Sequence, residues 1–298
     1  MNSIKGTSIM DKKFELDLST KRTLQHGIEV YRVKALKSFN DVKKGDLGGY
    51  VEKEENLSQD GNAWVYDNAL VYGGAKVYGN AEVSGDAEVS GDAVVAGDAK
   101  VGGNAYVSDV AKVYGRANVY GRAKVYGRAE VAGNAKVHGE AGVYGDAVVY
   151  DSARVYDKAM VAGNAQVSGD AWVCDNAKVY GKAKVADDAI VSGNALVAGT
   201  AEVYGKVDGD SVVDRHDKVF ENDKKFKLDL STKINRLRPE FYRVFGKAEV
   251  DGKAKVSGNT KVSGNDKVSG NATADVNLGH GLEELSSLQL GSDDHGRY

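Results

Sequence analysis

The sequence predicts an all-β protein, a parallel β-helix of triangular coils made of hexapeptide repeats, with a β-hairpin cap at its N-terminal end. Valine recurs at every sixth position from Val65 to Val203, twenty-four times without an exception. Alanine stands two residues before each of these valines, and the residue two after each is always Gly or Asp. Repetition at a fixed period indicates a solenoid, in which each unit packs on its neighbours.

The repeating unit, Ala-x-Val-x-(Gly/Asp)-x, predicts a short strand followed by a corner. Ala and Val alternate with other residues, which is the period of a strand. The fifth position suits left-handed backbone angles, which Gly adopts freely and Asp more readily than most residues. Because the repeat has an even number of residues, the alternation of side chains is the same after every corner. Ala and Val therefore point inward in each strand. Three strands close a triangle of 18 residues, so the block makes eight coils.

The composition excludes several other classes. The 37 glycines accompany a single proline, which argues against collagen, and strict valine placement argues against low-complexity disorder. A net charge of −3 gives no general attraction to nucleic acid or anionic membranes. Cys174 is the single cysteine, so no internal disulfide is expected. With neither a signal-peptide core nor an apolar run of about 20 residues, we expect a cytoplasmic protein without nucleic-acid or membrane partners.

Five regions are expected along the chain. They are an N-terminal cap with a β-hairpin (1–50), the regular β-helix (51–205), an irregular break (206–243), additional coils (244–274), and a C-terminal tail or short capping helix (275–298).

The cap is predicted from two alternating segments, "FELDL" at 14–18 and "IEVYRVKAL" at 28–36, joined by a turn at Gly27. An open stack of coils exposes unpaired strand edges and needs such a cover. Val51 and Leu57, six residues apart, continue as irregular first rungs into the regular repeat.

The predicted break contains a second copy of part of the cap. "DKKFKLDLSTK" at 223–233 repeats "DKKFELDLSTK" at 11–21 with one change, and "YRV" recurs at 31–33 and 242–244. From Val244 the six-residue step returns, although Thr260 and Asp266 replace the inner Ala. The tail has leucines spaced for a short amphipathic helix, at 282, 285, 288 and 290.

The segment "FNDVKKGDLGGYVEKEENLSQDGNAWVYDNA", residues 39–69, resembles the N-terminal signature of the YdcK-like proteins. These are classed as acyltransferases with left-handed β-helices, and they have phage-encoded relatives. The resemblance covers roughly residues 11–205. It implies left-handed winding, as in the hexapeptide-repeat acyltransferases, and it implies acyl-CoA as the cofactor if the chain is an enzyme. It also leaves a phage-encoded, phage-associated protein open.

Such acyltransferases use a histidine as general base, a carboxylate that orients it, and an acyl-CoA cleft shaped by a protruding loop. His138 and His216 are the weak catalytic candidates. The neighbours of His138 one coil away are Tyr120 and Tyr156, so no carboxylate is placed to orient its ring. A solvent-exposed replacement for the usual Tyr is the alternative interpretation of His138.

His216 lies in the predicted break beside Asp214 and Asp217, and a plain loop histidine is the alternative there. No residue is inserted between Val65 and Val203, so the repeat itself supplies no loop for a cleft. No metal-ligand spacing is present either.

Four outward apolar residues are the candidates for an interface. Trp172 and Ile190 are 18 residues apart and share one face, while Met160 and Leu196 share a second. Either these are scattered surface residues, which are normal, or they pack against another chain. Because the related acyltransferases are commonly trimers, self-association as a homotrimer is expected.

The stretch "KVYGRANVYGRAKVYGRAEV", residues 112–131, alternates basic and aromatic side chains as a nucleic-acid groove would. In the coil, however, Arg116, Arg122 and Arg128 fall at three successive corners and form a belt around the stack. Each has an acidic or amide neighbour one coil away, so the belt is expected to be charge-matched.

The function expected from these features is a structural or binding solenoid that self-associates, with no assigned catalytic site and no cofactor. The alternative is an acyl-CoA-dependent acyltransferase of the hexapeptide class. The uninterrupted repeat favours the first, and the family resemblance favours the second.

Overall fold

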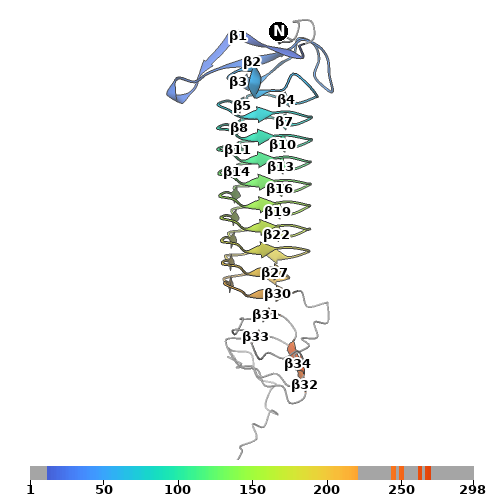
Figure 1. Ribbon diagram of the computed structural model, residues 1–298, viewed down its shortest axis with the longest axis vertical. Coiled ribbons are helices and arrows are strands. Elements are labelled where there is room, and N and C mark those ends of the chain that lie inside the picture. Colours follow the sequence, from blue (N-terminus) through green and yellow to red (C-terminus); the bar gives the residue numbers. More distant parts are fainter. Residues whose placement is uncertain (1–11, 221–242, 246–247, 252–260, 264–265, 270–298) are drawn as a thin grey trace, which may run out of the picture. The chain divides into compact units, whose positions relative to one another are not determined.

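The computed structural model describes residues 12–220 and four short strands between residues 243 and 269. Its described residues form β-strands and two short 3-10 turns, with no α-helix among them. The chain divides into two units, residues 1–219 and 220–298, which are treated separately below. The described part of the first unit is a parallel β-solenoid that begins with a hairpin (Figure 1).

Three sheets run along the solenoid, here called face 1, face 2 and face 3. Face 1 consists of β1 (Phe14–Thr23), β2 (Glu29–Ala35), β3 (Leu47–Val51), β5 (Leu70–Val71), β8 (Glu88–Val89), β11 (Tyr106–Val107), β14 (Lys124–Val125), β17 (Gly142–Val143), β20 (Met160–Val161), β23 (Lys178–Val179), β26 (Leu196–Val197) and β29 (Val212–Val213). Face 2 consists of β4 (Trp64–Val65), β7 (Glu82–Val83), β10 (Lys100–Val101), β13 (Asn118–Val119), β16 (Lys136–Val137), β19 (Arg154–Val155), β22 (Trp172–Val173), β25 (Ile190–Val191) and β28 (Lys206–Val207). Face 3 consists of β6 (Lys76–Val77), β9 (Val94–Val95), β12 (Lys112–Val113), β15 (Glu130–Val131), β18 (Val148–Val149), β21 (Gln166–Val167), β24 (Lys184–Val185), β27 (Glu202–Tyr204) and β30 (Lys218–Phe220). The two 3-10 turns are η2 (Gln25–Gly27) and η3 (Glu54–Asn56).

Each coil pairs in parallel with the next, and valine lies on valine. Val101 pairs with Val119, and the backbone N–H of Tyr120 donates to the carbonyl of Val137 at 3.0 Å. The valines and alanines of the repeat are buried in the centre of the coil. The predicted parallel β-helix of triangular coils is therefore confirmed. Left-handed winding stays a prediction from the family resemblance.

The corners explain why Gly and Asp share one position of the repeat. Asp109 has a φ of 57°, in the left-handed region that glycine adopts without strain. Its carboxylate compensates, because Oδ2 accepts a hydrogen bond from the N–H of Gly127, one coil further on, at 2.9 Å. At Gly91 a Cβ atom would lie 2.7 Å from the carbonyl oxygen of Asp109. Corners therefore accept residues that tolerate both a positive φ and close stacking.

The cap forms at the N-terminal end of face 1, as predicted. Strand β1 pairs antiparallel with β2, β2 pairs antiparallel with β3, and β3 then pairs in parallel with β5. Leu57 forms a parallel bridge with Val77, so the irregular first rung is also present. Gly48 lets β3 approach the first coil, because a Cβ there would lie 2.4 Å from the carbonyl oxygen of Val65.

The coil continues past residue 205, where the sequence analysis places the start of an irregular break. Strands β28, β29 and β30 add one more rung to each face. Val207, Val213 and Val219 keep the six-residue step, but the step from Val203 to Val207 is four residues. One corner is therefore two residues shorter, and the pairing interval falls from 18 to 16, as in Val191↔Val207.

In the second unit the structure describes β31 (Arg243–Phe245), β32 (Ala248–Asp251), β33 (Lys261–Ser263) and β34 (Asp266–Ser269). Val244 pairs in parallel with Val262, and Ala248 pairs with Asp266. Both intervals are 18 residues, the interval of a coil. The second cap copy at 223–233 and the tail at 275–298 lie outside the described residues.

A buried lysine closes the first coil. The Nζ atom of Lys13 donates to the carbonyl oxygens of Ala63 at 2.8 Å and Gly61 at 3.3 Å. The side chain is 1% exposed and lies 5.1 Å from the ring centroid of Phe39. Burial lowers the pKa of Lys13 to about 8, although Asp60 acts in the opposite direction. The lysine therefore satisfies carbonyls that have no preceding coil to donate to them.

We expect Lys13 to make stability rise with pH. Its folded pKa is about 8 against an ordinary lysine value of 10.5, so the unfolded chain binds more protons between these pH values. The contribution grows through this window, by up to about 3 kcal/mol. The melting temperatures of the wild type and of Lys13→Met, measured at pH 7 and pH 10, test this. The melting temperature of the wild type, relative to that of Lys13→Met, should be higher at pH 10 than at pH 7. The same difference at both pH values would contradict the expectation.

Candidate functional site

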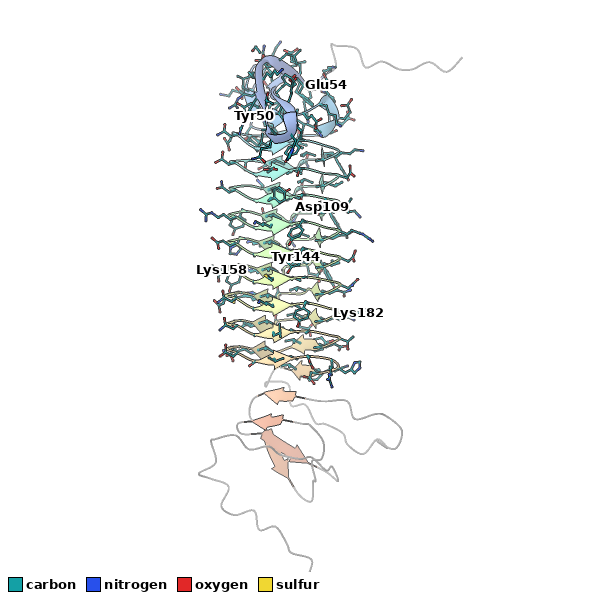
Figure 2. All side chains as sticks on the ribbon, turned by 90° about the vertical axis from the view of Figure 1, so that its left-hand side faces the viewer. Tyr50, Glu54, Asp109, Tyr144, Lys158 and Lys182 are labelled. Atoms are coloured by element: carbon teal, nitrogen blue, oxygen red, sulfur yellow. The ribbon has the colours of Figure 1, made fainter. Side chains whose placement is uncertain are left out.

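The outward side chains of the solenoid form columns, because each position lies above the same position of the previous coil (Figure 2). Opposite charges often meet along a column, as between Glu82 and Lys100 at 2.8 Å and between Lys112 and Glu130 at 3.0 Å. Such exposed pairs each contribute about 0–1 kcal/mol. The surface is therefore a set of ladders, and a candidate site must be built from neighbouring rungs.

His138 lies in an aromatic column on face 2. Its ring stacks on Tyr120 at 4.9 Å between centroids and on Tyr156 at 5.1 Å, nearly parallel to both. Burial lowers the pKa of His138; the charge of Asp157 acts in the opposite direction, and the charges of Lys136 and Arg154 lower it again. The prediction that tyrosines flank this histidine is confirmed, and both faces of its ring are covered.

The column continues to Cys174, which is 7% exposed although its position in the repeat points outward. The hydroxyl of Tyr156 hydrogen-bonds the thiol, and burial raises the pKa of Cys174. A thiol with a raised pKa is a weak nucleophile at neutral pH. Cys174 therefore has the properties of a packed side chain.

His216 lies at the last corner of the solenoid, where it is exposed. Its Nδ1 atom is 2.7 Å from the hydroxyl oxygen of Thr200. Of the two predicted neighbours, Asp217 is buried, and its Oδ2 atom accepts from the backbone N–H of Asp214 at 3.2 Å. His216 follows β29 and His138 follows β16, four coils apart, or about 19 Å along the axis at the usual strand spacing. The structure does not bring the two histidines together.

The apolar residues form two short runs. On face 2, Trp172 pairs directly with Ile190, and the guanidinium of Arg154 lies 5.0 Å from the centre of the Trp172 ring. Trp172 is 38% exposed and meets the Tyr156 ring edge to face. The predicted sharing of one face by Trp172 and Ile190 is therefore correct in geometry.

On face 1, Met160 and Leu196 share a column, but Lys178 lies between them. Leu196 instead pairs with Val212, which is 42% exposed. The sequence analysis missed Val212 because it placed this residue in the irregular break. The six-residue step that begins at Val207 is the signal that identifies it.

The arginine belt is charge-matched, as predicted. Arg116 lies 3.9 Å from Asp98, and Arg128 lies 3.7 Å from Asp146. Arg122 lies 3.4 Å from Glu140. Each pair joins neighbouring coils at a different corner, so the three guanidinium groups share no groove.

Within the described residues, no three His, Cys, Asp or Glu side chains gather closely enough to hold a metal ion. In the same part of the chain, no helix is long and apolar enough to cross a membrane.

We expect the aromatic column to control the protonation of His138. Its pKa should lie below the ordinary histidine value of 6.5 and rise toward it in Tyr120→Ala/Tyr156→Ala, because the double change exposes the ring. Titration of the imidazole protons by NMR measures both values. Tyr126→Ala/Tyr144→Ala, which removes a stacked pair from face 1, is the matched control and should leave the titration of His138 unchanged. An equal pKa in all three proteins would contradict the expectation.

No family model matches the chain. A segment of 33 residues is 48% identical to the Escherichia coli K12 protein named "Uncharacterized acetyltransferase YdcK". The segment is 11% of this chain, and it spans 10% of that relative's length. This short match and the β-solenoid fold are both consistent with a protein similar to the hexapeptide-repeat acyltransferases.

Proposed function

We propose that the protein is a structural or binding solenoid that self-associates. The observation that supports this most directly is the uninterrupted coil from β4 to β27, in which every strand follows the last after the same six-residue step. No loop protrudes from these coils to shape a cleft. A regular rod with ladders of side chains is suited to presenting a surface.

The histidines support the same conclusion. A general base needs a lone pair directed at substrate and a partner that orients the ring. His138 is held by stacking between two tyrosines, and Thr200 provides the contact at Nδ1 of His216. Neither histidine thus has the orienting carboxylate that the acyltransferase mechanism uses.

Face 2 is the proposed contact surface for a second copy of the chain. Trp172 presents a large, partly exposed ring beside Ile190, and tryptophan is among the residues that contribute most to interfaces. Leu196 and Val212, which pair with each other, form a second apolar surface on face 1. Assembly as a homotrimer is the form that the family resemblance favours.

An acyl-CoA-dependent acyltransferase is the second candidate, favoured by the 33-residue match to an acetyltransferase-named relative. In that case acyl-CoA is the cofactor, and His138 or His216 is the base. Because the coils lack a loop, another copy of the chain would have to complete the cleft.

We expect Trp172→Asp to weaken self-association, because it places a charge in the proposed interface. Sedimentation velocity over a range of concentrations measures the effect, with a loss of about tenfold or more in affinity expected. Tyr78→Asp changes a residue of similar exposure on face 3 and is the matched control. Equal association of both variants and the wild type would overturn the proposed interface.

Acetyl-CoA should give no saturable binding to the full chain in titration calorimetry. The reverse result, saturable binding that disappears in His138→Ala or His216→Ala, would favour the acyltransferase. Circular dichroism of both variants should match the wild type, since each histidine lies outside the Val–Ala core.

A further inference from the structure

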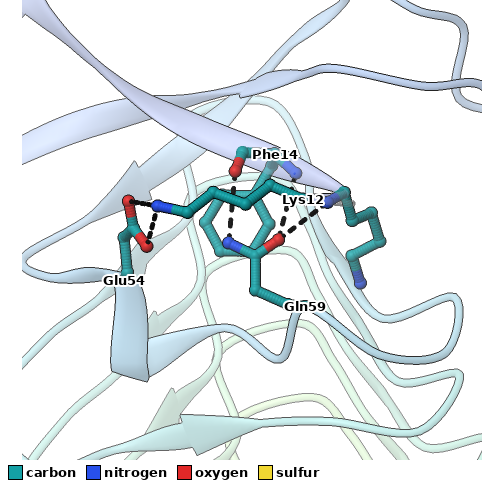
Figure 3. Close-up of polar contacts among 5 residues, drawn as sticks. Lys12, Phe14, Glu54 and Gln59 are labelled. Carbon is teal, nitrogen blue, oxygen red and sulfur yellow. Dashed lines mark hydrogen bonds and ion pairs between the residues drawn. The ribbon is translucent and has the colours of Figure 1, made fainter. Parts of the chain in front are cut away.

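The N-terminal end of the solenoid carries a docking site for residues 12–14, here called the cap site. The Oε1 atom of Gln59 accepts from the backbone N–H groups of Lys13 at 2.8 Å and Phe14 at 3.2 Å, and its Nε2 atom donates to the carbonyl of Phe14 (Figure 3). Lys12 contacts both carboxylate oxygens of Glu54 at 2.8 Å. The cap site thus recognises backbone and side chains of a short segment.

Packing completes this recognition. The ring of Phe14 meets Trp64 edge to face at 6.3 Å, and both side chains are buried. Trp64 occupies a position that points outward in other coils, so the docked segment is what covers it. With the Lys13 ammonium on the first coil's carbonyls, three successive residues, Lys-Lys-Phe, fill the cap site.

The chain contains a second segment with the same three residues. Residues 223–233 match 11–21 at ten of eleven positions, so Lys224, Lys225 and Phe226 correspond to Lys12, Lys13 and Phe14. The likeness extends to "EFYRV" at 240–244, which corresponds to "EVYRV" at 29–33. Everything that the cap site recognises in the first copy is therefore present in the second.

The partners of this segment are not duplicated. Gln59, Glu54 and Trp64 follow the first copy, whereas residues 245–281 contain neither Gln nor Trp. One chain thus carries two docking segments and one set of the residues that bind them.

We propose that the cap site binds residues 223–233 of a second copy of this chain, in exchange for residues 11–21. Because the segment and the site lie on different parts of the chain, the contact joins two copies by reciprocal exchange or joins further copies in succession. It involves the cap and not the Trp172 surface, so it goes beyond the lateral association proposed above.

The single difference between the segments sets the balance between them. Glu15, replaced by Lys227 in the second copy, lies 3.7 Å from Lys34 on the neighbouring strand β2. In the exchanged state two lysines would face each other, which favours the chain's own segment slightly. The chain's own segment also has a local concentration in the millimolar range, so exchange requires concentrated protein.

Zero-length carbodiimide cross-linking of the full chain tests the proposal. Unlabelled and 15N-labelled protein are mixed at about 1 mM, the range set by the competing segment. All samples carry Trp172→Asp, so that lateral association does not bring the copies together. Mass spectrometry should then find Lys224 coupled to Glu54 in peptides of mixed isotope. The coupling of Lys12 to Glu54 within one chain is the internal control, because these groups are in contact.

Three outcomes decide the result. Mixed-isotope coupling of Lys224 to Glu54 that disappears in Phe226→Asp supports the proposal. Coupling of Lys224 to Glu54 found only in peptides of a single isotope, with no mixed-isotope peptides, overturns it, because the second copy then returns to its own chain. Absence of Lys224 coupling while Lys12 couples normally also overturns it.

Charge variants give a graded control that leaves the core intact. Lys227→Glu restores the contact with Lys34 and should raise the mixed-isotope yield about threefold relative to the Lys12 coupling. Lys34→Glu repels Glu15 and attracts Lys227, so a rise of about tenfold is expected. Combining Lys227→Glu with Lys34→Glu makes both segments equally repelled, so the yield should fall back to about the threefold rise of Lys227→Glu alone. If the mixed-isotope yield is the same in all of these variants as in the unchanged charge background, the segment does not occupy the cap site.

Discussion

Each coil of this protein lies on the previous one through parallel backbone hydrogen bonds that pair residues 18 positions apart, as in Val101 and Val119. This interval places valine on valine and alanine on alanine, so a continuous apolar column fills the centre. It also places every outward residue above its counterpart, which turns the surface into ladders. Outward side chains in such a fold therefore contact residues of the neighbouring coils, as Arg122 contacts Glu140.

The same dependence on neighbours makes the ends special, because the first coil has no preceding coil to complete its hydrogen bonds. The cap solves this with an antiparallel hairpin and with a lysine whose Nζ atom contacts two carbonyls of the first coil. An ammonium group that is desolvated yet surrounded by acceptors is a specific solution to an unpaired edge. It also makes the cap a recognition site for a particular peptide segment.

The regular part of the solenoid is suited to a scaffold more than to catalysis. Its one histidine, His138, is shielded on both faces by the aromatic column and lies four coils from His216. The apolar surface of Trp172 and Ile190 and the cap site lie at different levels of the rod. The lateral contact and the cap-site contact between copies therefore use different residues in the proposed assembly.

Much of this structure was predictable from the repeat. The positions of Val and Ala, the corners at Gly and Asp and the pairing of Trp172 with Ile190 all follow from a period of six, and the cap hairpin follows from the alternating segments at 14–18 and 28–36. The repeat failed as a guide near Val207, because one corner is two residues shorter and Gly205, Ser211 and Asp217 replace the inner alanines. Register there is set by hydrogen bonds to the preceding coil, such as Ile190 N–H to Gly205 carbonyl.

Tertiary structure alone decided which outward residues are buried. Trp64 and Trp172 occupy the same position of the repeat on face 2, yet one is 2% exposed and the other 38%. The difference arises because residues distant in sequence, Phe14 and Phe39, cover Trp64. The sequence by itself determined the coil, since a local period specifies which side chains point inward. The environment of each outward side chain depends on what the rest of the chain places over it.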